Sequence, residues 1–181
     1  ATTSILLPAG RPLASRSTLP LQMASAGNQR VVIFDGALSY DSPSPLGQIE
    51  IRGLTAMLSR RGADVGSLGP ISVSVSRIQL EIGAVVMGTD SALAGDTLDI
   101  ITLNPFTVSR GETVPLRVTC DLSQNATPGN VVMTFTDSSF LTIVDKNLLT
   151  PVYPILSGST FPAAAGEISI VAGDLKSSFT N

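Results

Sequence analysis

Residues 106–135 read FTVSRGETVPLRVTCDLSQNATPGNVVMTF, and this stretch decides the fold class. Every second residue from Leu116 to Leu122 is apolar, which is the period-two pattern of a strand with one buried face. The polar run 123–130 contains a Pro-Gly pair and predicts a turn into a second strand over residues 131–136. The stretch therefore predicts a two-stranded hairpin of a β-sandwich, in the style of extracellular modules.

The composition fits one domain with an apolar surface. The chain has 181 residues, which is within the usual range of a single domain that buries a sizeable core. Charged residues make up 14% and hydrophobic residues 43% of the chain, although many of the latter are alanine. This balance favours a surface that neighbours or partners cover in part.

The charge pattern argues against nucleic-acid binding. The net charge is −3, and the pair Arg60–Arg61 is the largest basic cluster in the sequence. Binding to a phosphate backbone needs many cationic side chains on one face. No apolar run approaches the roughly 20 residues that a membrane-spanning helix needs, so the sequence predicts no transmembrane segment.

The rest of the chain reads as short β-rich runs with Gly, Pro, Asn and Asp between them. Residues 54–61 are the exception, because their apolar spacing predicts a helix of about two turns. Alternation over residues 71–75 changes phase at residues 78–82, which predicts a bulge near Ser76–Arg77. We therefore expect an all-β protein: a two-sheet β-sandwich or jelly roll of about nine to ten short strands with at most one short helix.

The N-terminal segment is set apart by its prolines. Pro8, Pro12 and Pro20 oppose helix formation and favour extended chain. We expect residues 1–30 to form an extended arm or edge strand, and residues 31–181 to form a single β-sandwich domain. The segment can complete its own domain, or it can add a strand to an adjacent copy.

The residues of most catalytic and zinc sites are missing. The chain has no histidine and a single cysteine, Cys120, which excludes Ser-His-Asp and Cys-His arrangements and a structural zinc site. Cys120 lies in the apolar row of its strand and is expected to be a small buried hydrophobe rather than a reactive thiol. The sequence contains no nucleotide-binding glycine motif and no hydrolase elbow.

Carboxylates are the remaining candidates for chemistry. Glycoside hydrolysis needs a pair of acids, and the four glutamates are Glu50, Glu81, Glu112 and Glu167. Sugar binding usually uses aromatic platforms, yet the chain lacks tryptophan and has only Tyr40 and Tyr153. We therefore predict that the chain is not an enzyme, and carbohydrate binding has weak support.

Calcium is the one cofactor that the loops suggest. Hard cations take several loop oxygens as ligands, and two acidic groups qualify: Asp35 with Asp41, and Asp90 with Asp96 and Asp99. Neither group has a known calcium-loop pattern, and solvated turn acids that cap strand ends explain both better than calcium does. We therefore predict no cofactor, with calcium as a possible exception and no catalytic residue assigned.

The C-terminal third resembles a known class of module. The strand at Leu116, the turn at Asn125–Asn130 and the closing run Gly166–Val171 are similar to the late strands of cohesin-like and Ig-like modules of bacterial surface proteins. The resemblance implies a jelly-roll sandwich that binds a protein partner on one sheet. It assigns no binding residue.

These observations lead to three hypotheses about function. The first is a non-catalytic extracellular protein–protein interaction module, a cohesin-like scaffold, adhesion or surface-structure domain. The second is a subunit of a larger assembly, a surface filament or virion shell, that uses residues 1–30 to contact a neighbour. The third is a carbohydrate-binding module. All three place the chain outside the cell or at the cell surface, with a protein partner or self-association in the first two.

Overall fold

The computed structural model describes residues 10–16, 21–62, 70–91, 93 and 95–172. Within them the chain forms two mixed β-sheets that pack face to face, and the only helical segment is the 3-10 turn η2 (Ile71–Val73). The expectation of an all-β, two-sheet fold is confirmed. The strands number thirteen rather than nine or ten, and several are longer than expected.

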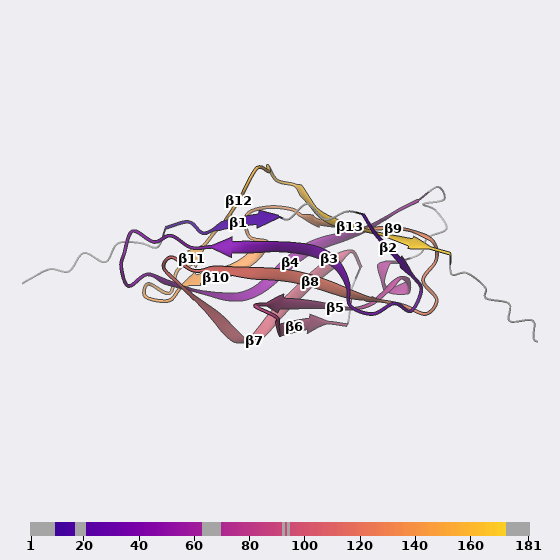
Figure 1. The fold of residues 1–181 in the computed structure, drawn as a ribbon, viewed down its shortest axis with the longest axis horizontal. Coiled ribbons are helices and arrows are strands. Elements are labelled where there is room, and N and C mark those ends of the chain that lie inside the picture. The colour runs from indigo at the N-terminus through magenta and orange to yellow at the C-terminus, as the bar shows by residue number, and fades with distance from the viewer. Residues whose placement is uncertain (1–9, 17–20, 63–69, 92, 94, 173–181) are drawn as a thin grey trace, which may run out of the picture.

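The first sheet has six strands, in the order β12-β1-β3-β8-β5-β6. From β1 to β6 the strands lie one below the other in Figure 1, across the long axis of the molecule. All neighbours are antiparallel except β1 and β12, which are parallel. The bounds are β1 Leu13–Arg16, β3 Val31–Ser39, β5 Val75–Ile82, β6 Val85–Asp90, β8 Thr113–Leu122 and β12 Ile155–Leu156.

The second sheet is organised around β4 (Gln48–Arg61). β7 pairs along one side of β4, while β10 and then β9 follow each other along its other side. β11 extends this sheet beyond β10, and β13 and β2 extend it beyond β9. The remaining bounds are β2 Gln22–Ser25, β7 Thr97–Ser109, β9 Gly129–Phe135, β10 Leu141–Asp145, β11 Pro151–Val152 and β13 Ala163–Val171.

The helix predicted over residues 54–61 is wrong, because these residues form the second half of β4. Leu54, Ala56 and Leu58 are buried, whereas the residues between them are more exposed. This spacing fits a period of two as well as a helical turn, and pairing with β7 and β9 decides between them. The strand continues through Gly53. Glycine is needed at this position because a Cβ would lie 2.5 Å from the Ile100 carbonyl oxygen.

The predicted bulge near Ser76–Arg77 is confirmed. The pairing of β5 with β8 shifts register between Val75 and Arg77. The alternating run before it is not a strand, however, because residues 71–73 form η2. Pro70 before η2 has extended backbone and begins this turn.

The two strands of the 106–135 stretch are both present, but they do not form a hairpin. β8 belongs to the first sheet and β9 to the second, so residues 123–128 carry the chain from one sheet to the other. The buried face of β8 is as predicted: Leu116, Val118, Cys120 and Leu122 are all buried. Local alternation predicts which face is buried, but not which strand lies next to it.

Part of the segment 1–30 pairs within its own chain. β1 pairs with β3 and β12, and β2 pairs in parallel with β13. Residues 1–9 and 17–20, which belong to the predicted arm, lie outside the described residues.

Four phenylalanines link the sheets across the core. Phe34 from β3 meets Phe135 from β9 edge to face, with ring centroids 5.3 Å apart. Phe135 stacks on Phe140 at 4.2 Å, and Phe140 lies 5.9 Å from Phe161. Phe34, Phe135 and Phe140 are fully buried. This row of rings therefore joins both sheets and the segments before β10 and β13.

We expect Phe135→Ala to destabilise the fold by about 3–5 kcal/mol, because it removes the ring that contacts both Phe34 and Phe140 and leaves a cavity. Urea denaturation measures the change. Leu103→Ala is the matched control at an exposed position and should change stability by less than about 0.5 kcal/mol. Equal effects of the two substitutions would contradict the role of the aromatic row.

Candidate functional site

Each of the four glutamates considered for catalysis makes a polar contact within the fold. Glu81 is buried on the outer face of the first sheet, where the Arg30 guanidinium covers it at 2.6 Å. Glu50 lies on the other sheet and accepts from Arg52 at 2.9 Å. Glu112 caps the turn after β7 by accepting from the Ser109 amide, and Glu167 accepts from the Asn130 side chain. Each of the four glutamates therefore has a structural partner.

The acidic residues considered for calcium do not gather into a group of three among the described residues. Asp35 lies within β3 rather than in a loop, and it pairs with Arg117 at 3.2 Å. Asp41 is exposed beyond the end of that strand. The Asp90 carboxylate accepts from the Asp99 amide. Among the described residues, no three carboxylates or thiolates come close enough to hold a metal ion.

Cys120 is a core residue, as the sequence predicts. It is 1% exposed, and burial raises the pKa of its thiol from near 9 to about 12, with a smaller contribution from the Asp121 charge. A reactive thiol needs the opposite shift.

A hollow of about 310 Å³ lies at one end of the sandwich, beside β10 and β11. Its walls come from segments far apart in sequence: Arg11 before β1, Ser138 before β10, Asp145 at the end of β10, and residues 150–153. We call it the Tyr153 hollow. The Arg11 Nε donates to the Tyr153 carbonyl oxygen at 3.1 Å, which ties the N-terminal strand to this wall.

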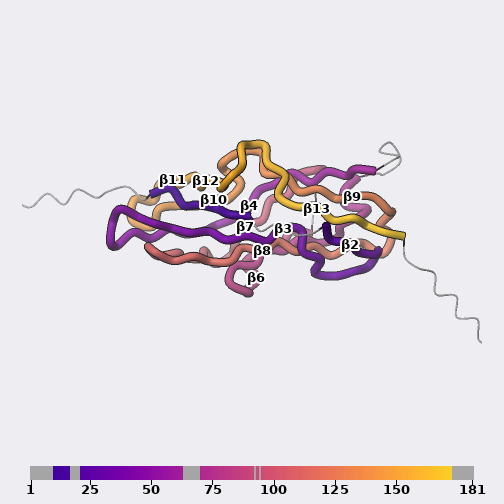
Figure 2. The backbone as a smooth tube through the Cα atoms, turned by 45° about the horizontal axis from the view of Figure 1, so that its top comes forward, coloured from indigo at the N-terminus to yellow at the C-terminus, as the bar shows by residue number. Residues whose placement is uncertain are grey.

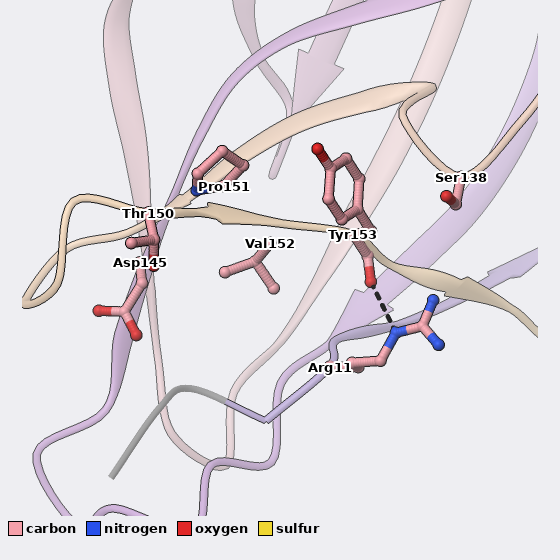
Figure 3. A pocket seen from close by; sticks show the side chains of 7 residues that line it. All are labelled: Arg11, Ser138, Asp145, Thr150, Pro151, Val152 and Tyr153. Atoms are coloured by element: carbon pink, nitrogen blue, oxygen red, sulfur yellow. Dashed lines mark hydrogen bonds between the residues drawn. The ribbon is translucent and has the colours of Figure 1, made fainter. Parts of the chain in front are cut away.

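Side chains alternate along this wall. Figure 3 shows the Tyr153 ring and Pro151 on one side of the backbone, with Val152 on the other. Tyr153 is 50% exposed, whereas Val152 packs against the core. The residues that line the hollow thus include a half-exposed tyrosine, an arginine that bonds to the Tyr153 carbonyl, and the hydroxyl-bearing Ser138 and Thr150.

Asp145 fixes the turn that borders the hollow. Its Oδ1 accepts from the amides of Asn147 at 2.8 Å and Leu148 at 3.0 Å. Its own amide donates to the Thr150 carbonyl, and its carbonyl accepts from the Leu149 amide, both at 2.8 Å. The carboxylate points away from the Tyr153 ring (Figure 3). This is the usual work of an aspartate at a turn.

Tyr40, the other tyrosine, is buried at the same end of the molecule. Its amide donates to the Glu112 carbonyl, and its carbonyl accepts from the Gly111 amide. Burial is the main cause of the raised pKa of its phenol; the Ser42 hydroxyl lowers this pKa and the Asp145 charge raises it. Tyr40 is therefore a neutral part of the interior rather than an accessible platform.

A second hollow, of about 380 Å³, is lined by Asn147 of the 145–150 turn and by residues before β4 and after β7. Gln48, Arg110 and Asn147 supply its polar side chains. We call it the Arg110 hollow. Three hydrogen bonds hold its wall: Arg110 amide to Gly47 carbonyl, Gln48 Nε2 to Ser109 Oγ, and Asn147 Nδ2 to Leu46 carbonyl.

A different surface is purely aliphatic. Val85 and Val86 on β6 and Ile101 and Leu103 on β7 are exposed, with Leu103 at 92%. β6 stands out from the lower side of the molecule (Figure 2). We call these four residues the β6–β7 ridge.

A protein partner or self-association stays a prediction. No helix in the described part of the chain is long and apolar enough to cross a membrane.

No protein-family model matches the chain, and no curated protein matches it significantly. Two of the solved structures that match the chain illustrate the degree of similarity. One is a family 123 glycoside hydrolase from Clostridium perfringens, with 9% identity and a TM-score of 0.43; the match covers 91% of this chain but only 28% of the hydrolase. The other is AvmM, which catalyzes macrocyclization in alchivemycin A biosynthesis, with 11% identity, a TM-score of 0.42, and coverage of 94% of this chain and 93% of AvmM.

These findings correct two predictions. Both similar structures are enzymes, and neither is a cohesin or Ig-like module. The predicted non-catalytic interaction module and the prediction that the chain is not an enzyme are contradicted and are not kept. At these identities and TM-scores, neither enzyme's activity is transferred to this chain.

Sequence reasoning missed the Tyr153 hollow. It counted Tyr153 as one of two scattered tyrosines, whereas the fold brings Arg11 to it across 142 positions. The one local signal was Pro151, since proline within a short β-rich run indicates an edge strand with an accessible side.

We expect Cys120 to stay unmodified by a thiol reagent in the folded protein at about pH 8 and to react after unfolding, because its buried thiol stays protonated.

The raised pKa of the Cys120 thiol also has a consequence for stability. The unfolded thiol ionises above about 9 and the folded one only near 12, so its stabilising contribution is complete below pH 9 and is lost as pH rises towards 12. Denaturation of Cys120→Ala should lack this part of the alkaline decline. Rapid labelling of the native protein would contradict the assignment.

Proposed function

We propose that the chain binds a carbohydrate at the Tyr153 hollow. The observation that carries the proposal is the half-exposed ring of Tyr153 beside a hollow of about 310 Å³ that also presents a guanidinium and two hydroxyls. This volume is in the range of small-ligand sites, which combine apolar contact with a few placed polar groups.

The chemistry of a sugar matches this combination. The C–H groups of a pyranose ring carry slight positive charge and pack against the electron-rich face of an aromatic ring. Its hydroxyls both donate and accept, as the Ser138 and Thr150 hydroxyls do. The terminal NH₂ groups of Arg11 add donors, because its Nε is already used by the Tyr153 carbonyl.

The hollow is also prepared before a ligand arrives. The Asp145 carboxylate and the Thr150 carbonyl hold the turn at one side, and the Arg11 bond holds the other. Groups that are fixed in place lose less conformational entropy on binding. This favours recognition by the turn end of the sandwich over recognition by a flat sheet face.

We expect Tyr153→Ala to raise the Kd for a bound glycan about tenfold, because it removes a stacking surface worth about 1.5 kcal/mol. Tyr153→Phe keeps the ring and should stay within a few-fold of the unchanged protein. A glycan array identifies the sugar, and calorimetry measures the Kd values.

Met23→Ala is the control, since Met23 is an exposed apolar residue on β2, outside the hollow. It should leave binding unchanged. No binding to any sugar on the array, or equal binding by Tyr153→Ala and the unchanged protein, would overturn the proposal.

A further inference from the structure

Residues of a single turn, 145–150, contribute to the lining of both hollows. Asp145, Thr150 and Pro151 line the Tyr153 hollow, while Asn147 lines the Arg110 hollow. Asp145 and Asn147 are two residues apart, so their Cα atoms lie within about 7 Å of each other. The Asn147 amide donates to the Asp145 carboxylate at 2.8 Å, which makes the turn a shared, fixed wall.

Resting on the proposed function, we propose that the bound carbohydrate is an oligosaccharide that extends from the Tyr153 hollow across the 145–150 turn into the Arg110 hollow. The Tyr153 hollow takes one sugar by stacking. The Arg110 hollow takes a following unit by polar contacts.

The polar groups of the Arg110 hollow suit sugar hydroxyls. Gln48 and Asn147 each use one amide N–H within the protein, towards Ser109 and the Leu46 carbonyl. Side-chain amides carry two donors and a carbonyl acceptor, so each retains both kinds of group for a ligand. A neighbouring pair of donor and acceptor is what vicinal hydroxyls bind.

Arg110 is available as the strongest donor of this hollow. Its side chain is 46% exposed, and its contact with Asp41 is long, at 4.0 Å, to a carboxylate side chain that is itself 95% exposed. An ion pair of this kind contributes little, so a ligand can take its place. The Arg110 backbone, in contrast, is held in place, because its amide donates a hydrogen bond to the Gly47 carbonyl at 3.0 Å.

The backbone beneath these side chains, at Gly47 and Gln48, is tightly packed and hydrogen-bonded. A Cβ at Gly47 would lie 2.1 Å from the Ser42 hydroxyl oxygen, so the loop closes tightly there. The Lys146 amide donates to the Gln48 carbonyl at 3.0 Å and fastens the 145–150 turn to the start of β4. The two hollows are therefore held in a fixed relation to each other.

The test compares chain lengths on the full protein. The array carries glucose, galactose, mannose, xylose and N-acetylglucosamine, each as the monosaccharide, the linear trimer and the linear hexamer, and calorimetry follows each hit. We expect the trimer of the recognised sugar to bind about tenfold more tightly than its monosaccharide. Arg110→Ala should remove most of that gain and leave monosaccharide binding unchanged.

Arg117→Ala is the matched control. Arg117 is 51% exposed and paired with an aspartate, like Arg110, but it lies on the outer face of the first sheet. It should leave the Kd of every sugar on the array unchanged.

The two proposals fail in different ways. If Tyr153→Ala weakens binding but trimer and monosaccharide bind equally, or Arg110→Ala has no effect on the trimer, the extended site is overturned and the Tyr153 site stands. If Tyr153→Ala affects neither length, or no sugar binds, both are overturned.

Discussion

The bend of β4 at Arg52–Gly53 is the constraint on which the second sheet depends. β4 is the one strand that pairs with β7, β9 and β10. Both β7 and β10 shift register opposite Arg52, and the Thr102 hydroxyl donates to the Arg52 carbonyl at 3.0 Å to close the gap. Gly53 is required at this point, because the Ile100 carbonyl approaches too closely for a side chain. The register shift lets the two halves of β4 use different partners on one side, while β7 pairs with residues 48–57 on the other.

The same register places the candidate site. Ile49 of β4 pairs with Asp145, and Gln48 pairs with Ser109. The first residues of β4 thus set the end of β10 beside the end of β7, and the turns that leave these strands form the walls of both hollows. A slip of one residue along β4 would turn the core face outwards and would also separate Gln48 from the 145–150 turn. Fold and site therefore depend on one set of backbone hydrogen bonds.

The sequence predicts local features, such as the buried face of a strand, but not contacts between distant segments. The buried row Leu116–Leu122 and the bulge after Val75 follow from alternation alone, because a strand face is a property of neighbouring residues. Residues 54–61 fit two periods, and only their pairing with β9 and β7 selects the strand. Tyr153 carries no local signal of function. Pro151 indicates locally only that this edge is accessible; the contact with Arg11 joins residues 142 positions apart, and no short window of sequence contains it.

The β6–β7 ridge and the Tyr153 hollow differ in what they can recognise. The β6–β7 ridge presents four aliphatic side chains, and Ile101 and Leu103 stand out where β7 bulges opposite Arg52. Burial of such a surface against any apolar partner is favourable, and its contacts do not discriminate among ligands by hydrogen bonding. At the turn end, the hollow that Tyr153 lines also has polar lining residues, and Asp145 and Arg11 make hydrogen bonds that hold its backbone. Discrimination requires polar groups that a wrong ligand would leave unpaired. Selective binding of a polar ligand therefore belongs to the turn end, although the ridge is the more apolar of the two.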